Sequence, residues 1–305
     1  MGRKQYQHIS EVQAWLNMLR ISNAPTIISN VMVGLALAIQ SHALAWSDYS
    51  LPPRLDFPKI LIVITVAMLL MYFSGMLFND AMDAKWDKKH RPNRPIPSGV
   101  IKRNDAWLTA SFMMVCAVLL CGMQQGTLQL SIVLSLAVLA YTFFHRWLFP
   151  AAILMALSRS LVYFIAMTAL SPPPPFGNLL GFCIAIGVYT TILTVLGRNE
   201  HDDNTKHAWL TWLMLIPPII PLVMYGEAHE FTWMMLVIYV AWVCMAWRDF
   251  RKPNSQPIAG MHKLLAGFCL LDCVLIAMIG EISIMIVSLI CFVFAVAAHR
   301  RVMGT

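Results

Sequence analysis

The sequence predicts an all-α protein, a polytopic bundle of nine to ten transmembrane helices. Two observations support this class. Apolar residues make up 59% of the chain and charged residues 12%, against roughly 45–50% and about 25% in ordinary soluble domains. The apolar residues also gather in runs of about 20 residues, the length of a helix that crosses a bilayer. Because no repeat or low-complexity tract divides the chain, we expect a single membrane domain over residues 1–305.

The apolar runs and the charges between them favour ten spans. The predicted spans are 21–40, 59–79, 106–123, 129–145, 151–169, 178–197, 208–225, 231–247, 264–280 and 282–299. Of the 22 Lys and Arg residues, Arg54 and Lys59 fall on one side of this arrangement and Arg159 falls inside a span. All the others share the opposite side, which the positive-inside rule assigns to the cytoplasm. This distribution explains the net charge of +7 without a nucleic-acid partner, and it predicts that both termini are cytoplasmic.

Local signals predict the elements between the long runs. Ser10-x-x-Gln13 resembles a capping box, so a short helix in the membrane interface is expected before the first span. Residues 41–58 form an outer loop, and the prolines at 217, 218 and 221 are expected to kink the seventh span. The sequence Arg94-Pro-Ile-Pro-Ser-Gly99 cannot continue a helix, so it should turn the chain back against the preceding charged segment.

That charged segment, Asn79-Asp80-x-x-Asp83-x-x-x-Asp87, directly follows an apolar run. If the helix continues, the three carboxylates lie on one face with Asn79 beside them. Carboxylates at this spacing repel one another unless a cation lies between them. Oxygen ligands without Cys suit a hard cation such as Mg²⁺, which readily shares a substrate phosphate. The pattern therefore predicts a site for a phosphorylated or diphosphorylated ligand on the cytoplasmic side.

Basic residues follow the carboxylates at positions Lys88, Lys89, Arg91 and Arg94. They either hold the same anion or anchor the loop to acidic lipid headgroups. The simplest alternative is a solvated, positive loop of a transport protein. It does not account for the regular spacing of the acidic residues at the mouth of a span.

Other polar residues interrupt the apolar runs. Arg20 and Asn23 mark the entrance of the first span, where Arg20 serves either as a positive-inside anchor or as a ligand. Arg159 lies in a span, where an Arg either faces a polar cavity or snorkels to the interface. Asp272, deep in the ninth span, either touches the cavity or bonds a neighbouring helix, and we favour the second reading.

A second charged cluster ends the sixth predicted span, at the same membrane face as Asp80. It reads Arg198-Asn199-Glu200-His201-Asp202-Asp203-Asn204-Thr205-Lys206-His207. Two acidic clusters at equivalent depths can converge on one ligand. Such a pair suits a diphosphate bridged by two Mg²⁺ ions, which neutralise a leaving group as its charge develops.

These motifs resemble those of the UbiA superfamily of intramembrane prenyltransferases. The likeness rests on Asn79-Asp80-x-x-Asp83-x-x-x-Asp87 followed by Arg94-Pro95-Ile96-Pro97-Ser98-Gly99, and the other polar positions fall in the expected order along most of the chain. The Arg-Pro-Ile-Pro-Ser-Gly form is similar to that of the chlorophyll synthase and geranylgeranylglyceryl phosphate synthase branch. The resemblance implies a helical bundle around a central cavity that is open sideways to lipid and binds an isoprenyl diphosphate.

The resemblance also implies roles for individual residues. Asp80, Asp83 and Asp203 would be catalytic. One Mg²⁺ would be bound by Asn79, Asp80, Asp83 and Asp87, and a second by Asn199, Glu200, Asp202 and Asp203. Substrate would be bound by Arg20, Asn23, Lys88, Arg91, Arg94, Tyr141, Arg146, Arg159 and Arg198.

The chain departs from the family pattern in two respects. The usual second motif has three Asp residues, whereas the best register here is Asn199-x-x-x-Asp203-x-x-x-His207. Either Glu200 and Asp202 substitute from a shifted register, or the second metal binds weakly. The family typically has nine spans, whereas the charge pattern here favours ten.

The leading hypothesis is Mg²⁺-dependent transfer of an isoprenyl group from a polyprenyl diphosphate to an aromatic or lipid-like acceptor within the membrane. The reaction would proceed through an allylic carbocation and release pyrophosphate. The competing hypothesis is an isoprenoid-binding or transport protein on the same fold, in which the altered second motif no longer ionises the diphosphate.

The ten-span arrangement predicts that the C-terminus is cytoplasmic. A tag placed after Thr305 should be inaccessible to a membrane-impermeant label in intact cells and accessible after permeabilisation. Labelling of the tag in intact cells would contradict ten spans and restore nine.

Overall fold

The computed structural model describes residues 10–45, 57–170, 176–198, 208–226, 228–251 and 258–301. All regular secondary structure in these ranges is helical, which confirms the predicted all-α class. The elements are α1 (Glu11–Met18), η1 (Ile21–Asn23), α2 (Ala24–Ala45), α3 (Phe57–His90), α4 (Arg103–Gly122), α5 (Thr127–Phe144), α6 (Leu148–Leu170), α7 (Phe176–Arg198), η3 (Ala208–Leu215), α8 (Ile216–Tyr225), α9 (Glu230–Arg251), α10 (Ile258–Ile279) and α11 (Ile282–Arg301).

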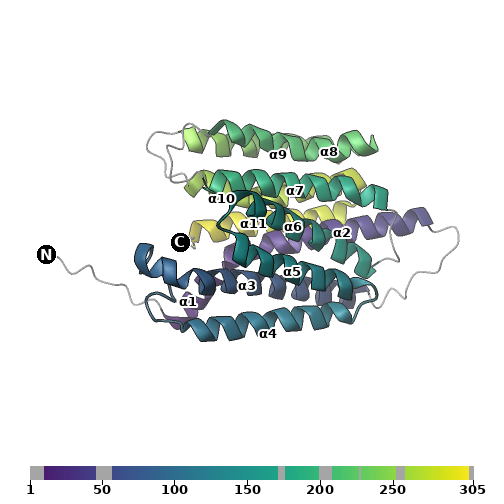
Figure 1. Ribbon diagram of the computed structural model, residues 1–305. Coiled ribbons are helices and arrows are strands. Elements are labelled where there is room, and N and C mark those ends of the chain that lie inside the picture. The colour runs from purple at the N-terminus through teal and green to yellow at the C-terminus, as the bar shows by residue number, and fades with distance from the viewer. Residues whose placement is uncertain are drawn as a thin grey trace.

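Ten helical segments in the described ranges are long and apolar enough to cross a membrane, as the charge pattern predicted. Their bounds lie close to the predicted ones; for example, 208–225 is recovered as Ala208–Tyr225. Figure 1 shows the long helices running side by side, with α8 and α9 along one edge of the bundle and α4 along the opposite edge. The chain is therefore an integral membrane protein.

The helices α2 and α10 form the centre of the bundle. Both are buried along most of their length, whereas most other spans expose apolar side chains at their outer faces. Helix α10 packs against α9, α11 and α2, and α2 packs against α6. The apolar outer faces are those that contact lipid in a membrane, so the interior is the place for polar groups.

The helix α3 places the acidic motif. It continues without a break for 34 residues, from Phe57 to His90, as the spacing of the carboxylates required. At ~1.5 Å per residue it is roughly 50 Å long and exceeds the ~30 Å hydrocarbon layer. Its last turns, which carry Asp80, Asp83 and Asp87, therefore extend beyond the apolar run at one end of the bundle.

The structure adds detail to two local predictions, the capping box before the first span and the effect of the prolines in the seventh. Ser10 caps α1 by accepting a hydrogen bond from the Gln13 backbone N–H at 3.2 Å, but the Gln13 side chain bonds Asn17, so the capping box is half formed. The seventh span changes from the 3₁₀ segment η3 to the α-helix α8 at residue 216. Pro217 and Pro218 lie in the first turn of α8, where a missing N–H costs no hydrogen bond.

Close packing of α2 against α6 depends on Gly34. A Cβ at this position would lie 2.6 Å from Ala166 Cβ and 2.6 Å from the Tyr163 carbonyl oxygen. At Gly187 in α7 the nearest atoms would be 3.6 and 3.7 Å away, which is ordinary contact. Gly34→Ala should destabilise the protein by roughly 1–3 kcal/mol through overpacking, and Gly187→Ala should not. Thermal unfolding in detergent measures both, and equal melting temperatures for the two variants would contradict this packing.

Candidate functional site

The carboxylates at the end of α3 meet cationic side chains from separate segments of the chain. Arg94, in the turn after α3, lies with Nη1 2.8 Å from Asp87 Oδ2 and 3.8 Å from Asp80 Oδ1. Arg20, between α1 and η1, places Nη2 3.5 Å from the same Asp80 oxygen. The Arg94–Gly99 turn therefore folds back against the acidic face, as its sequence predicted.

Asp83 is paired with another segment of the chain. Its Oδ1 lies 3.1 Å from His145 Nε2 and 3.6 Å from Arg146 Nη2. Both partners follow α5, and Arg198 at the end of α7 donates a hydrogen bond to the His145 carbonyl oxygen. The hydrogen bond with Asp83 raises the pKa of His145 above its ordinary value, while partial burial of the ring opposes this shift.

Arg20 adopts a strained backbone conformation. Its φ of 46° and ψ of 52° are left-handed, and no other non-glycine residue in the described ranges has a positive φ. Tyr72 donates a hydrogen bond to the Arg20 carbonyl oxygen at 3.2 Å, and Arg20 Nη1 lies 3.4 Å from Met76 Sδ. Contacts from α3 therefore fix both the backbone and the side chain of Arg20, and they direct its guanidinium toward Asp80.

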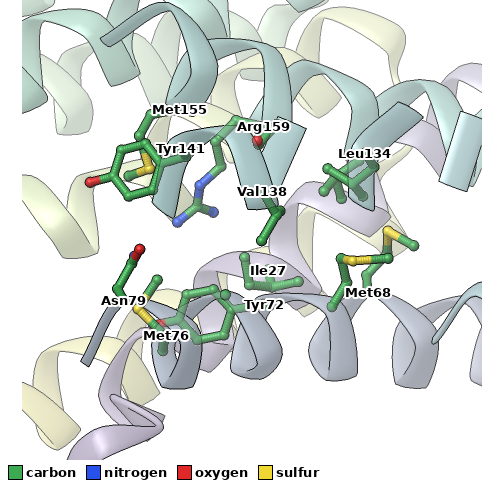
Figure 2. Close-up of a pocket in the computed structure, with 14 residues that line it drawn as sticks. Ile27, Met68, Tyr72, Met76, Asn79, Leu134, Val138, Tyr141, Met155 and Arg159 are labelled. Atoms are coloured by element: carbon green, nitrogen blue, oxygen red, sulfur yellow. The ribbon is translucent and has the colours of Figure 1, made fainter. Parts of the chain in front are cut away.

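A pocket extends from this charged cluster into the bundle. Figure 2 shows Asn79 and Tyr141 at one end, Met68 and Leu134 at the other, and Arg159 between them. At the far end Met68, Met71 and Leu134 are almost fully buried. The pocket is lined by Ile27, Met68, Met71, Tyr72, Gly75, Met76, Asn79, Leu134, Val138, Tyr141, Met155, Ser158, Arg159 and Val162. The cavity therefore has a polar mouth beside the acidic motif and an apolar interior.

Arg159 is bonded in the cavity wall and does not snorkel to the interface. Its Nη1 donates to Asn30 Oδ1 at 2.6 Å and its Nη2 donates to Thr26 Oγ1 at 3.1 Å. Its guanidinium carbon lies 4.4 Å from the centre of the Phe268 ring. Asp272, for which a bond to a neighbouring helix was favoured, accepts from Asn30 and from Tyr163.

The acidic motif has donor atoms that fit a hard cation. Among the described residues, the buried oxygens Asn79 Oδ1 and Asp87 Oδ1 have no hydrogen-bond partner. Buried oxygens without a partner are uncommon and call for an explanation such as an ion. Within the same residues no three His, Cys, Asp or Glu side chains gather around one point. The oxygen atoms of the motif are thus suitable ligands for a hard cation. In this structure its carboxylates are paired with Arg and His side chains.

The structure does not bring every candidate residue to this cluster. Lys88 and Arg91 are exposed, and Arg91 lies over the Trp86 ring at 5.9 Å. The Asn23 side chain meets His299, with Asn23 Oδ1 2.9 Å from His299 Nε2. The second-motif residues lie outside the described part of the chain; they are Asn199, Glu200, Asp202 and Asp203.

Sequence reasoning did not assign several residues that belong to the site. Nothing in the sequence paired His145 with Asp83 or Asn30 with Arg159. Tyr72, within an apolar run, gave no signal of its contact with Arg20. Contacts between residues so far apart in sequence depend on the packing of the helices.

The chain resembles known proteins in sequence. A model of the UbiA prenyltransferase family matches residues 31–266. The 4-hydroxybenzoate octaprenyltransferase of Aliivibrio fischeri (strain MJ11) is 31% identical over 164 residues, which are 53% of this chain and 57% of that protein. The enzyme of the same name from Nitrosomonas eutropha (strain DSM 101675 / C91 / Nm57) is 33% identical over 134 residues, which are 42% and 47% of the two chains. The match thus spans about half the length of these relatives.

Solved structures share the fold. A UbiA homologue from Archaeoglobus fulgidus bound to GPP and Mg²⁺ matches with a TM-score of 0.61 and 12% identity, over 89% of this chain and 99% of that one. The apo structure of a UbiA homologue from Aeropyrum pernix K1 matches with a TM-score of 0.59 and 16% identity, over 85% and 96% of the two chains.

The backbone of Arg20 yields a stability prediction. A left-handed conformation costs a non-glycine residue roughly 1–2 kcal/mol, whereas glycine adopts it freely. Arg20→Ala and Arg20→Gly both remove the guanidinium, so their difference reports the backbone alone. We expect Arg20→Gly to be the more stable variant by about 1 kcal/mol in thermal unfolding. An Arg20→Ala variant that is equally or more stable would show that the left-handed conformation is not retained.

Proposed function

The chain belongs to the UbiA prenyltransferase family, and from this premise we propose that it transfers an isoprenyl group from a polyprenyl diphosphate to an acceptor within the membrane. The C–O bond between the allylic carbon and the diphosphate breaks, and a bond from that carbon to the acceptor forms. The acceptor loses a proton and pyrophosphate is released.

One observation carries this proposal: a cluster of acidic and basic side chains stands at the mouth of an apolar cavity. A prenyl diphosphate has the same division, since its head is strongly anionic and its tail is hydrocarbon. The head would lie near Asp80 and Arg94, and the tail would lie against Met68 and Leu134. Burial of the tail supplies affinity by the hydrophobic effect, and the charged mouth fixes the position of the reacting carbon.

The oxygen donors of the motif fit a Mg²⁺ ion, which would be held by Asn79, Asp80, Asp83 and Asp87. The orphaned oxygens Asn79 Oδ1 and Asp87 Oδ1 support this assignment, as does the Mg²⁺ in the Archaeoglobus homologue. When bound, the metal neutralises charge that develops on the leaving diphosphate. A second Mg²⁺ would involve Asn199, Glu200, Asp202 and Asp203, and Asp203 retains the one carboxylate in register with the family motif.

The basic residues around the motif would bind the remaining charge of the diphosphate. Arg20, Arg94 and Arg146 each lie within 4 Å of a motif carboxylate, so a ligand that draws the carboxylates toward a metal frees these cations for phosphate oxygens. Tyr141 at the mouth and Tyr72 next to it line the cavity, where aromatic faces would stabilise a developing carbocation. Both contributions would lower the barrier to C–O cleavage.

The acceptor would enter beside Arg159. A guanidinium in an apolar wall suits a carboxylate, and the curated relatives are 4-hydroxybenzoate octaprenyltransferases. We therefore favour an aromatic acid as the acceptor. The similarity of the first motif to the chlorophyll synthase and geranylgeranylglyceryl phosphate synthase branch remains a prediction, as does the cytoplasmic location of the site.

The motif carboxylates provide a test of the proposed reaction. Asp80→Asn and Asp83→Asn should each lower pyrophosphate release at least about 100-fold, because each removes charge from the proposed metal site. Asp105→Asn, an exposed carboxylate in the first turn of α4, should retain wild-type release. Protein in lipid nanodiscs with geranyl diphosphate and 4-hydroxybenzoate provides the assay. Substantial activity in Asp80→Asn would contradict the assignment.

Removal of the metal provides a further test. Excess EDTA should abolish pyrophosphate release, and Mg²⁺ added beyond the chelator should restore it. Equilibrium binding of the diphosphate is measured in the same samples. Binding and release together distinguish the transferase from the isoprenoid-binding or transport protein, the two hypotheses that the sequence left open. Binding without release, for every donor and acceptor tried, would favour an isoprenoid-binding or transport protein.

A further inference from the structure

Asp272 has no part in the reaction as described above, although a carboxylate in the centre of a membrane bundle is costly. It is fully buried in α10, the most enclosed helix of the described bundle. Both of its oxygens are bonded: Oδ2 accepts from Asn30 Nδ2 at 2.9 Å, and Oδ1 accepts from the Tyr163 hydroxyl. Asn30 belongs to α2 and Tyr163 to α6, so Asp272 joins three helices at one point.

Asn30 connects this carboxylate to the cavity, and the direction of its hydrogen bonds is fixed. Arg159 can only donate, so the Asn30 carbonyl oxygen must face it at 2.6 Å. The amide NH₂ of Asn30 then faces Asp272, whose oxygen must accept. The three side chains form a polarised relay in which the negative charge lies at one end and the positive charge at the other.

The relay leaves most of the guanidinium available. A direct carboxylate–Arg pair is often bidentate and occupies two donors with one partner. Here Asn30 takes one of the five N–H donors and Thr26 takes a second. No carboxylate of a described residue lies within ion-pair distance of Arg159. The positive charge of Arg159 is thus offset by Asp272 through Asn30 and not by a direct ion pair. Its remaining N–H donors can face the cavity.

Helix α10 holds the guanidinium in a second way. Phe268 lies one turn before Asp272, on the same face of α10, and its ring lies 4.4 Å from the Arg159 guanidinium carbon. The ring restricts the guanidinium from one side, and Asn30 and Thr26 restrict it at its edge. Phe268 and Asp272 both lie beyond residue 266, where the family match ends.

We propose that Asp272 is a positioning residue that acts through Asn30 to hold the Arg159 guanidinium toward the cavity, where it binds the anionic group of the acceptor. This inference rests on the proposed function, because it assigns Arg159 to the acceptor. Asp272 itself touches no substrate. Its loss should therefore weaken acceptor binding more than it slows the chemical step.

The test is a double-mutant cycle on 4-hydroxybenzoate binding by the full chain in nanodiscs. Asp272→Asn removes the charge and replaces a side chain that can only accept by an amide that can donate or accept. Asn30 is then no longer held with its NH₂ toward position 272 and its carbonyl oxygen toward Arg159. Arg159→Met removes the cation and keeps an extended apolar side chain. Asp272→Asn should raise the Kd and the KM for 4-hydroxybenzoate roughly tenfold, with a smaller change in kcat.

The decisive result is the effect of Asp272→Asn in the Arg159→Met background. If Asp272 acts through Arg159, its substitution there no longer changes the Kd for 4-hydroxybenzoate. Equal effects in both backgrounds, or no effect of Asp272→Asn on wild type, would overturn the proposal. Ser288→Ala, which removes a buried hydroxyl from α11, is the control for general disturbance of the core and should leave the Kd unchanged.

Three outcomes need separate treatment. If Asp272→Asn does not fold, Tyr163→Phe removes one of the two donors to Asp272, and it should raise the Kd in the same direction only while Arg159 is present. If wild type binds 4-hydroxybenzoate but releases no pyrophosphate with any prenyl diphosphate, the transferase proposal fails while the binding cycle still decides the role of Asp272. A wild type that does not bind 4-hydroxybenzoate would overturn the positioning role together with the choice of acceptor.

Discussion

The pairing of the α3 carboxylates with Arg and His side chains is the interaction on which the arrangement of the site depends. Three carboxylates on one helix face repel one another, and at the mouth of an apolar cavity water screens them poorly. The chain brings Arg20, Arg94, His145 and Arg146 to this face from three different connections between helices. The folding of the turns after α3 and α5 is therefore coupled to the charge on α3.

The same constraint explains the division of the cavity. Charged groups with several partners stand at the mouth, whereas the interior admits polar groups only when each is bonded. Arg159 follows this rule through Asn30, Thr26 and Phe268. In hydrocarbon an unbonded charge costs several kcal/mol, so this division of the cavity suits a prenyl diphosphate with its anionic head at the charged mouth and its hydrocarbon tail inside. In the proposed reaction this orientation would place the bond that breaks beside the charged mouth.

The sequence was informative where the signal is local. Composition, run length and the sidedness of Lys and Arg predicted the helical class and the ten spans, because hydrophobic length and charge act directly on insertion. The spacing of Asp80, Asp83 and Asp87 predicted one continuous helix face. The Arg94–Gly99 turn was also predictable, since its prolines cannot extend α3. The family assignment followed from these same two segments and is confirmed by the match over residues 31–266.

The partners of these residues could not be predicted. His145 and Asp83 are 62 positions apart, and Asn30 and Asp272 are 242 apart, so their contacts depend on how the helices pack. The left-handed conformation of Arg20 had no signal either, because residues that usually adopt it are Gly, Asn or Asp. The roles of Lys88, Arg91 and the residues of the second motif remain predictions.

The most direct test of the central claim is detection of the prenylated product. Purified protein in lipid nanodiscs is incubated with geranyl diphosphate, 4-hydroxybenzoate and Mg²⁺, and the acceptor is analysed by mass spectrometry. We predict a product whose mass exceeds that of the acceptor by one geranyl group less one hydrogen, formed together with pyrophosphate and absent with Asp80→Asn. Binding of geranyl diphosphate without any prenylated product, across donors of different length and acceptors of different class, would contradict the transferase.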